Sequence, residues 1–229
     1  MQQILSSPKA ITIAVIELTS RCNLNCGFCV STDDNIEKTT EQAKAIIDNL
    51  APSIKRVVFT GGEPLLRKDL PELLLYAKTK GYETKVHTNG YLLPAWKEEQ
   101  LALIDILNLP IDSYKEEIND AMRAHGSFHV TLRTLEQMKH LGKKVSVTTV
   151  VTQENYQDMY GLRDLLASFQ NITSWKLFLF NPTGNGSRNK ERFQLSPEDF
   201  DLATKDLSLP HVKVIPVKDF FSWKTAEFY

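Results

Sequence analysis

The strongest constraint on the fold is a repeated alternation of strand-like and helix-like segments. Short apolar runs rich in β-branched and aromatic residues predict strands. The predicted strands are 12–18, 56–60, 83–89, 104–111, 143–151 and 174–180, with a possible last one at 212–217. Segments with apolar residues three and four positions apart predict helices between them. The predicted helices are 39–50, 69–80, 94–103, 114–124, 128–141, 156–168 and 197–206.

Strands that alternate with helices in this way form parallel sheets with right-handed crossovers. The pattern allows an open doubly wound sheet or a barrel. We predict an α/β fold, a partial (β/α)6 TIM-type barrel with parallel strands, in residues 1–210, followed by a C-terminal strand or tail, 211–229. The aromatic-rich end at 219–229 is compatible with a truncated chain, a docked strand or an exposed partner surface. In such barrels the chemistry lies on the loops after the strands.

The composition excludes several classes of protein. Of 229 residues, 42% are hydrophobic and 24% charged, which is typical of a globular chain and not of a disordered or collagen-like one. The formal net charge of −1 does not favour binding to duplex nucleic acid or to an anionic membrane. No apolar run approaches the roughly 20 residues that span a bilayer. The N-terminus lacks the basic and apolar regions of a secretory signal, so we expect a cytoplasmic location.

All three cysteines of the chain, Cys22, Cys26 and Cys29, follow the first predicted strand with the spacing C-x3-C-x2-C. Their odd number and close spacing argue against a disulfide framework. Zinc sites usually take four protein ligands, and His87 at the end of the third predicted strand is a possible fourth. A cubane iron–sulfur cluster normally takes four thiolates, so three would leave one iron open to another ligand. We favour the cluster.

A second motif, F-T-G-G-E-P at 59–64, directly follows the second predicted strand. Together with the cysteine spacing and Phe28 before the last cysteine, it makes the chain resemble the radical S-adenosylmethionine (SAM) superfamily. The resemblance implies a [4Fe-4S] cluster on the three cysteines and SAM as cofactor. It also implies that the GGEP loop contacts the SAM amino group. Glycines allow a close backbone approach, and a carboxylate accepts from an ammonium group.

The same resemblance extends from about residue 10 to 205 and assigns cofactor contacts at the ends of the later strands. A T-N-G sequence ends the third strand, a polar residue ends the fourth, and an arginine follows in a segment that pairs with the cofactor carboxylate. The resulting cofactor-binding residues are Gly61, Gly62, Glu63, Pro64, Thr88, Asn89, Ser113, Arg123, Asn155 and Phe178, with Cys22, Cys26 and Cys29 as the metal ligands.

The resemblance implies reductive cleavage of SAM to methionine and a 5′-deoxyadenosyl radical, which abstracts hydrogen from a substrate. Reduced flavodoxin or ferredoxin is the expected electron donor. The substrate is open between a small molecule and a peptide.

The sequence supports three more specific alternatives. The sequence W-K-L-F, with Lys176, resembles the viperin-like, nucleotide-modifying branch, although the fifth strand lacks the lysine expected there. The basic, glycine-containing loop 181–192 is a candidate phosphate-binding loop for such a substrate. A peptide-modifying maturase is the second, although no cysteine follows Cys29 to hold auxiliary clusters. The third is a non-catalytic metal-binding or redox-sensing barrel.

Overall fold

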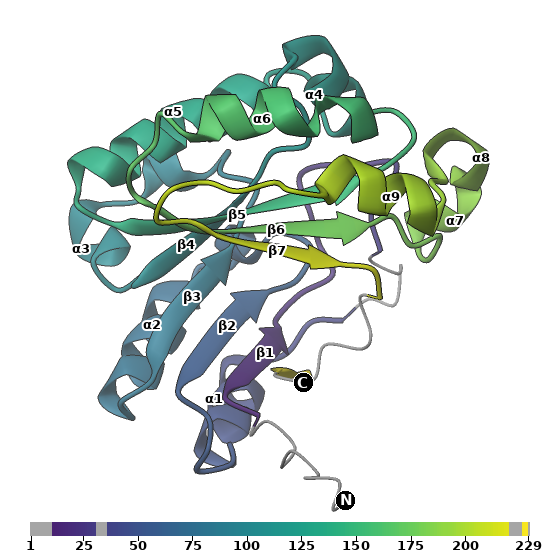
Figure 1. Ribbon diagram of the computed structural model, residues 1–229. Helices are drawn as coiled ribbons and strands as arrows, with labels where there is room; N and C mark the ends of the chain where they lie inside the picture. The colour runs from purple at the N-terminus through teal and green to yellow at the C-terminus, as the bar shows by residue number, and fades with distance from the viewer. Residues whose placement is uncertain (1–10, 31–35, 220–225, 229) are drawn as a thin grey trace, which may run out of the picture.

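A computed structural model describes residues 11–30, 36–219 and 226–228 of the chain. In these residues eight parallel strands form one curled sheet, in the order β7-β6-β5-β4-β3-β2-β1-β8 (Figure 1). The strands are β1 Ile13–Glu17, β2 Arg56–Thr60, β3 Glu83–His87, β4 Ile106–Pro110, β5 Lys144–Val151, β6 Ile172–Leu179, β7 Lys213–Val217 and β8 Ala226–Phe228. The predicted partial barrel is confirmed as a half-barrel whose edge strands are β7 and β8.

The helices connect consecutive strands and lie outside the curled sheet (Figure 1). They are α1 Thr40–Asp48, α2 Leu70–Thr79, α3 Glu98–Leu101, α4 Glu116–Met122, α5 Ser127–His140, α6 Met159–Leu166, α7 Asn185–Arg188, α8 Lys190–Phe193 and α9 Pro197–Thr204. Three short 3-10 helices are η1 Pro64–Leu66, η2 Leu93–Ala95 and η3 Tyr156–Asp158.

Two predictions about helices were wrong in detail. The single helix predicted at 94–103 is interrupted, because Trp96 has extended backbone between η2 and α3. The second piece begins where the side chain of Gln100 accepts a hydrogen bond from the backbone N–H of Lys97, at 2.9 Å. The segment 181–192, predicted as a loop, contains α7 and most of α8.

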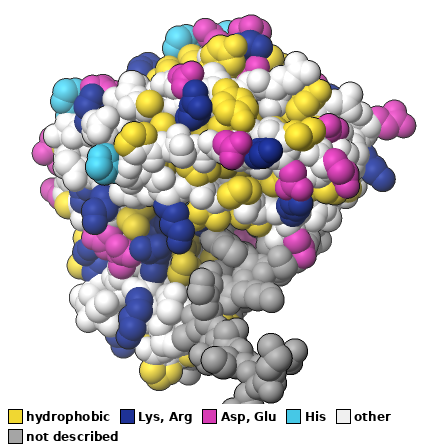
Figure 2. All heavy atoms as spheres, in the orientation of Figure 1, with side chains coloured by type: hydrophobic (Ala, Val, Ile, Leu, Met, Phe, Trp, Pro, Cys, Tyr) yellow, Lys and Arg dark blue, Asp and Glu magenta, His cyan; other side chains and the backbone are white. Residues whose placement is uncertain are grey.

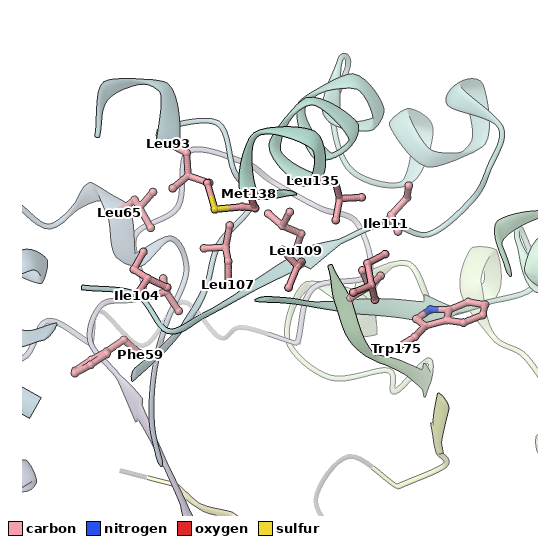
Figure 3. Packing of buried hydrophobic residues seen from close by; sticks show 14 of the residues in the cluster. Phe59, Leu65, Leu93, Ile104, Leu107, Leu109, Ile111, Leu135, Met138 and Trp175 are labelled. Carbon is pink, nitrogen blue, oxygen red and sulfur yellow. The ribbon is translucent and has the colours of Figure 1, made fainter. Parts of the chain in front are cut away.

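The main hydrophobic core lies between the convex face of the sheet and the helices. Alternate strand residues such as Leu107 and Leu109 are buried there. Figure 3 shows Leu135 and Met138 of α5 pointing toward this face of β4. The core therefore stabilises the outer layer of the barrel and leaves the concave face for other side chains.

The strands at the two edges extend the sheet beyond the six predicted units. β7 pairs with β6, and β8 pairs with β1. The predicted boundary at residue 210 falls between β6 and β7, and the division of the chain there stays a prediction. None of the helices in the described ranges has the length and apolar character needed to cross a membrane.

Candidate cofactor site

The cysteine loop begins directly after β1, and its two ends are hydrogen-bonded to each other. Ser20 N–H donates to the carbonyl of Ile36 at 2.7 Å, and Lys38 N–H donates to the carbonyl of Leu18 at 3.0 Å. Between them, the hydroxyl of Thr19 donates to Glu37 at 2.5 Å. The loop therefore starts and ends at a fixed position beside the carboxyl end of β1.

Arg67, which follows η1, holds both ends of this loop. Its buried guanidinium donates to the carbonyl of Leu18 at 3.2 Å and to the carbonyl of Lys38. Asp69 orients the same guanidinium through contacts of 3.0 and 2.5 Å. A planar guanidinium with several donors suits this bridging position better than an ammonium group does.

The GGEP loop after β2 packs directly on the backbone of the cysteine loop. Gly62 N–H donates to the carbonyl of Thr19 at 2.7 Å, and Glu63 N–H donates to that of Arg21 at 2.8 Å. A Cβ atom at Gly61 would lie 2.2 Å from the carbonyl oxygen of Thr19, and one at Gly62 would lie 2.3 Å from that of Arg21. The close approach that these glycines allow in this structure is therefore to the loop that carries the cysteines.

Glu63 connects the GGEP loop to the T-N-G sequence after β3. Its buried carboxylate accepts hydrogen bonds from Leu65 N–H at 3.0 Å, Thr88 Oγ1 at 2.8 Å and Asn89 N–H at 2.7 Å. Burial raises the pKa of Glu63, and these donors oppose the rise. Pro64, also buried, begins η1.

Asn89 in turn reaches the cysteine loop. Its side-chain amide donates to Asn23 Oδ1 at 2.8 Å and lies 3.9 Å from Cys22 Sγ. The structure thus brings the loops after β1, β2 and β3 together through Glu63 and Asn89.

Arg123 at the end of α4 approaches the cysteine loop from the other side. Its guanidinium lies 5.0 Å from the ring centre of Phe28 and its Nε lies 2.5 Å from Oδ2 of buried Asp112. Burial lowers the pKa of Arg123, but the charges of Asp112 and Cys26 outweigh it and leave that pKa raised. Neither Nε nor Oδ2 has the angles of a hydrogen bond to a described residue. The ion pair holds the guanidinium beside the cysteine loop.

Two predicted contact residues are engaged in other interactions. Ser113 is fully buried, and its hydroxyl donates to Asp158 at 2.6 Å. The amide of Asn155 donates to the carbonyls of Asp112 at 2.7 Å and Val150 at 2.9 Å, which joins the ends of β4 and β5. Both stabilise the loops around the site, and their assignment as cofactor contacts stays a prediction.

The segment with α7 and α8 covers the cysteine loop. Asn189 donates to the carbonyl of Gly27 at 3.0 Å, Gly186 N–H donates to that of Cys29 at 3.1 Å, and Asn185 donates to Asn25 at 3.1 Å. Phe193 packs edge-on against Phe28, with ring centres 5.9 Å apart.

These contacts give a role to Asn185, Asn189 and Gly186 in a segment whose sequence indicates only a basic loop. Among its basic residues, Arg192 forms an ion pair with Glu154 at 2.5 Å. The segment therefore acts as a cover for the cysteine loop in this structure.

A cavity of about 250 Å³ lies on the concave side of the sheet, beside this loop. Phe178, which is 9% exposed, contributes to its wall together with Cys29 and Phe28. The remaining lining residues are Val15, Val30, Thr60, His87, Asn108, Thr148, Val150, Lys176, Leu179 and Asn181. A cavity between the cysteine loop and an aromatic wall is suited to a cofactor with a flat ring and to a substrate next to it.

The three cysteines lie within the described ranges, and none of them forms a disulfide. Burial raises the pKa of Cys26 to about 11, and the charges of Cys29 and Cys22 contribute to the rise. Within the described residues, no group of three or more His, Cys, Asp or Glu side chains is arranged to hold a metal ion. Because each thiolate of a cubane binds a different iron, the thiols need not converge on one point. The donor set of three thiols on one loop fits such a cluster.

In the described ranges, no group of three or more possible metal ligands includes His87 and the cysteines. His87 lines the cavity, and its Nε2 is buried without a hydrogen-bond partner among the described residues. Burial lowers its pKa well below the usual value, and the charges of Lys85 and Lys176 lower it further, so the ring is neutral.

Sequence comparison identifies the family. The family described as "Radical SAM superfamily" matches residues 16–166. A Fe-coproporphyrin III synthase of Methanosarcina barkeri is 36% identical over 162 residues, which cover 67% of this chain and 40% of that protein. A mycofactocin maturase of Mycolicibacterium smegmatis is 33% identical over 178 residues, covering 75% of this chain and 45% of that protein. The chain spans less than half the length of these two relatives.

The fold agrees with this result. SuiB of Streptococcus suis, bound to the precursor peptide SuiA, superposes with a TM-score of 0.67 at 18% identity, over 90% of this chain and 49% of that chain. The chain therefore belongs to the radical SAM superfamily, a class of enzymes that use SAM and an iron–sulfur cluster. The predicted resemblance is confirmed.

Proposed function

We propose that this chain binds a [4Fe-4S] cluster through Cys22, Cys26 and Cys29 and cleaves SAM to initiate radical chemistry on a substrate in the half-barrel. The observation that carries the proposal is the contact between three loops, after β1, β2 and β3, at the rim of the cavity. When bound, the cluster supplies the electron that cleaves SAM to methionine and a 5′-deoxyadenosyl radical, which abstracts a hydrogen atom from the substrate.

The residues of the chain position the cofactor and exclude water. Glu63, buried and held by three donors, keeps acceptor capacity for the SAM amino group. Arg123, next to Phe28, is placed to bind the carboxylate, and Phe178 provides an apolar surface for the adenine. The α7–α8 segment covers the loop, and its exclusion of water protects a reactive radical from side reactions.

Two substrate classes, a peptide and a small molecule, each have an observation in their favour. A relative is named a maturase, and SuiB is described with a precursor peptide, which favours a peptide. The side chains on the concave face favour a small molecule with a charged group, as argued below. Reduced flavodoxin or ferredoxin is the proposed electron donor.

The test is an anaerobic assay of the protein reconstituted with iron and sulfide, reduced with dithionite and supplied with SAM. We expect formation of 5′-deoxyadenosine, and Cys26→Ala should abolish both cluster absorbance and product. Product formation by Cys26→Ala would refute the proposal. One zinc per chain after native purification, with no SAM binding, would support the non-catalytic metal-binding alternative instead.

A further inference from the structure

The concave face of the sheet carries an unusual set of side chains for a barrel interior. Inward positions in such barrels are commonly filled by bulky branched apolar residues. Here they include Lys85 and His87 on β3, Asn108 on β4, Thr148 on β5 and Lys176 on β6. The strand register places these residues near one another, since His87 pairs with Asn108 and Thr148 pairs with Lys176. Asn108 Oδ1 accepts hydrogen bonds from Ser146 at 2.7 Å and from Thr148 at 3.0 Å, so these polar groups pair within the sheet, whereas the lysines and His87 line its concave side.

Basic side chains outnumber the acidic Glu17 and Glu83 among the described residues of this face. Lys85 is 4% exposed and Lys176 is 8% exposed. Burial lowers the pKa of Lys85 well below its usual value, and the charges of Lys176 and Arg56 lower it further. Burial and the charges of Arg56 and Lys213 lower the pKa of Lys176 to about 8. Glu83 pairs with Arg56 at 2.5 Å and only partly offsets this charge.

Figure 2 shows Lys and Arg side chains beside acidic ones on the surface next to the grey residues. Positive charges gathered along a cavity attract an anion.

The cavity connects this basic region to the cofactor site. Lys176 and His87 line the cavity. In the strand register His87 is level with Asn108 and Ser146, and Phe178 lies two residues beyond Lys176 on β6, beside Cys29 and Phe28 in the cavity wall. The buried Nε2 of His87 has no hydrogen-bond partner among the described residues, and a neutral imidazole can donate from this atom. One end of the cavity therefore offers positive charge and a donor, and the other end is apolar.

We propose that the substrate carries an anionic group, a carboxylate or a phosphate, that binds inside the half-barrel to Lys176 and His87, with Lys85 close by on the same face of the sheet. This inference rests on the proposed function, because it names the substrate class of the same cavity. The apolar wall contacts the less polar part of the substrate and directs it toward the cysteine loop. The volume of about 250 Å³ suits a small molecule.

Calorimetric binding to the reconstituted protein tests the proposal without requiring turnover. The probes are 3-phenylpropionate, phenyl phosphate and the neutral 3-phenylpropionamide. We expect at least one of the two anions to bind. The anion that binds more tightly identifies which group the site prefers, a carboxylate or a phosphate. The amide should bind at least about tenfold more weakly than the better anion. Equal binding of the amide and the better anion, or no binding of either anion, would overturn the proposal.

Variants locate the site. Lys176→Met and Lys85→Met remove charge with little change in volume, and Lys139→Met on the exposed surface of α5 is the matched control. We expect Lys176→Met to weaken anion binding at least about tenfold and Lys139→Met to leave it unchanged. Unchanged binding in both Lys176→Met and Lys85→Met would contradict the proposed site.

The wild type provides a second measurement that needs no variant. Arg56, Lys85, His87 and Lys213 surround Lys176, and its pKa of about 8 predicts that anion affinity falls about tenfold between pH 7 and pH 9. A pH-independent affinity would contradict the role of Lys176. Formation of 5′-deoxyadenosine without substrate is assayed separately, so loss of anion binding with intact SAM cleavage rejects only this inference.

Discussion

At the scale of single residues, Glu63 combines a structural and a proposed binding role. Its carboxylate accepts from Leu65, Thr88 and Asn89 and is fully buried. Glu63→Gln replaces one acceptor oxygen by an NH2 group that must face a donor. We expect this variant to lower the free energy of unfolding by about 1–3 kcal/mol and to weaken SAM binding. Urea denaturation and SAM titration measure the two effects.

The control for this prediction is Glu98→Gln, because Glu98 lies exposed in the first turn of α3. It should change the free energy of unfolding by less than about 0.5 kcal/mol. A Glu63→Gln protein as stable as this control would show that the hydrogen bonds of Glu63 do not hold the two loops together.

Gly62 has a different constraint, which is the space available to a side chain. A Cβ atom there would lie 2.3 Å from the carbonyl oxygen of Arg21, and that oxygen belongs to the cysteine loop. We expect Gly62→Ala to destabilise the fold by about 3 kcal/mol and to reduce iron incorporation. Gly81→Ala is the matched control, since its φ of +85° is strained but nothing lies within 4 Å. It should cost about 1 kcal/mol with normal iron content.

Lys176 shows how a residue placed for binding can reduce stability. Its pKa falls from 10.5 to about 8 on folding, chiefly through burial, so the folded state disfavours the protonated form. Below pH 8, protonated Lys176 lowers the free energy of unfolding by its full amount. The free energy of unfolding rises as the pH increases from about 8 to 10.5, because in this range the unfolded state binds more protons than the folded state does. We expect Lys176→Met to be more stable at pH 7 by up to about 3 kcal/mol.

Urea denaturation at several pH values tests this expectation. The difference between Lys176→Met and the wild type should shrink above pH 8. A difference that is constant from pH 7 to 10.5 would mean that Lys176 does not titrate with the lowered pKa. The same variant should lose anion binding while gaining stability, which separates a binding defect from misfolding.

At the scale of elements, the cysteine loop depends on a segment far away in the sequence. Asn189, between α7 and α8, donates to the carbonyl of Gly27 at 3.0 Å. We expect Asn189→Ala to accelerate loss of iron to a chelator several-fold, with a cost in stability of about 1 kcal/mol. Ser187→Ala is the control, because that hydroxyl is exposed and donates to the carbonyl of Gly184 within its own segment. Equal rates of iron loss in the two variants would rule out this role of the α7–α8 segment.

The elements also show what the sequence could and could not predict. The apolar patterns located β1–β6 and most helices, because their apolar residues face one continuous core, and the possible last strand at 212–217 is confirmed as β7. The cysteine spacing and the GGEP motif predicted which loops form the candidate site, because both motifs are local. Arg67 and Asn189 carry no local signal, since their partners are carbonyl groups of distant segments. The same limit applies to Lys85, whose burial depends on the curl of the sheet.

At the scale of the whole molecule, the fold and the candidate site rest on separate sets of contacts. The main core contains residues from β1–β6 and the outer helices, whereas Phe28, Met122, Phe180 and Phe193 form a small separate cluster beside Cys26. Such separation is expected where a stable scaffold carries functional loops. The sheet should therefore not require the cluster in order to fold.

Hydrogen exchange of the reconstituted and iron-free proteins tests this separation. We expect the iron-free chain to keep the protection of β2–β6 and a cooperative unfolding transition, because the main core contains none of the cysteines. Protection should fall in 18–30 and in 185–193, since those segments contact each other through Asn189 and Phe193. The triple variant Cys22→Ser, Cys26→Ser, Cys29→Ser should show the same pattern of hydrogen-exchange protection as the iron-free protein. If removal of iron instead abolished protection in β4 and β5, the cluster would be part of the folding core, and the division of the molecule into scaffold and site would be incorrect.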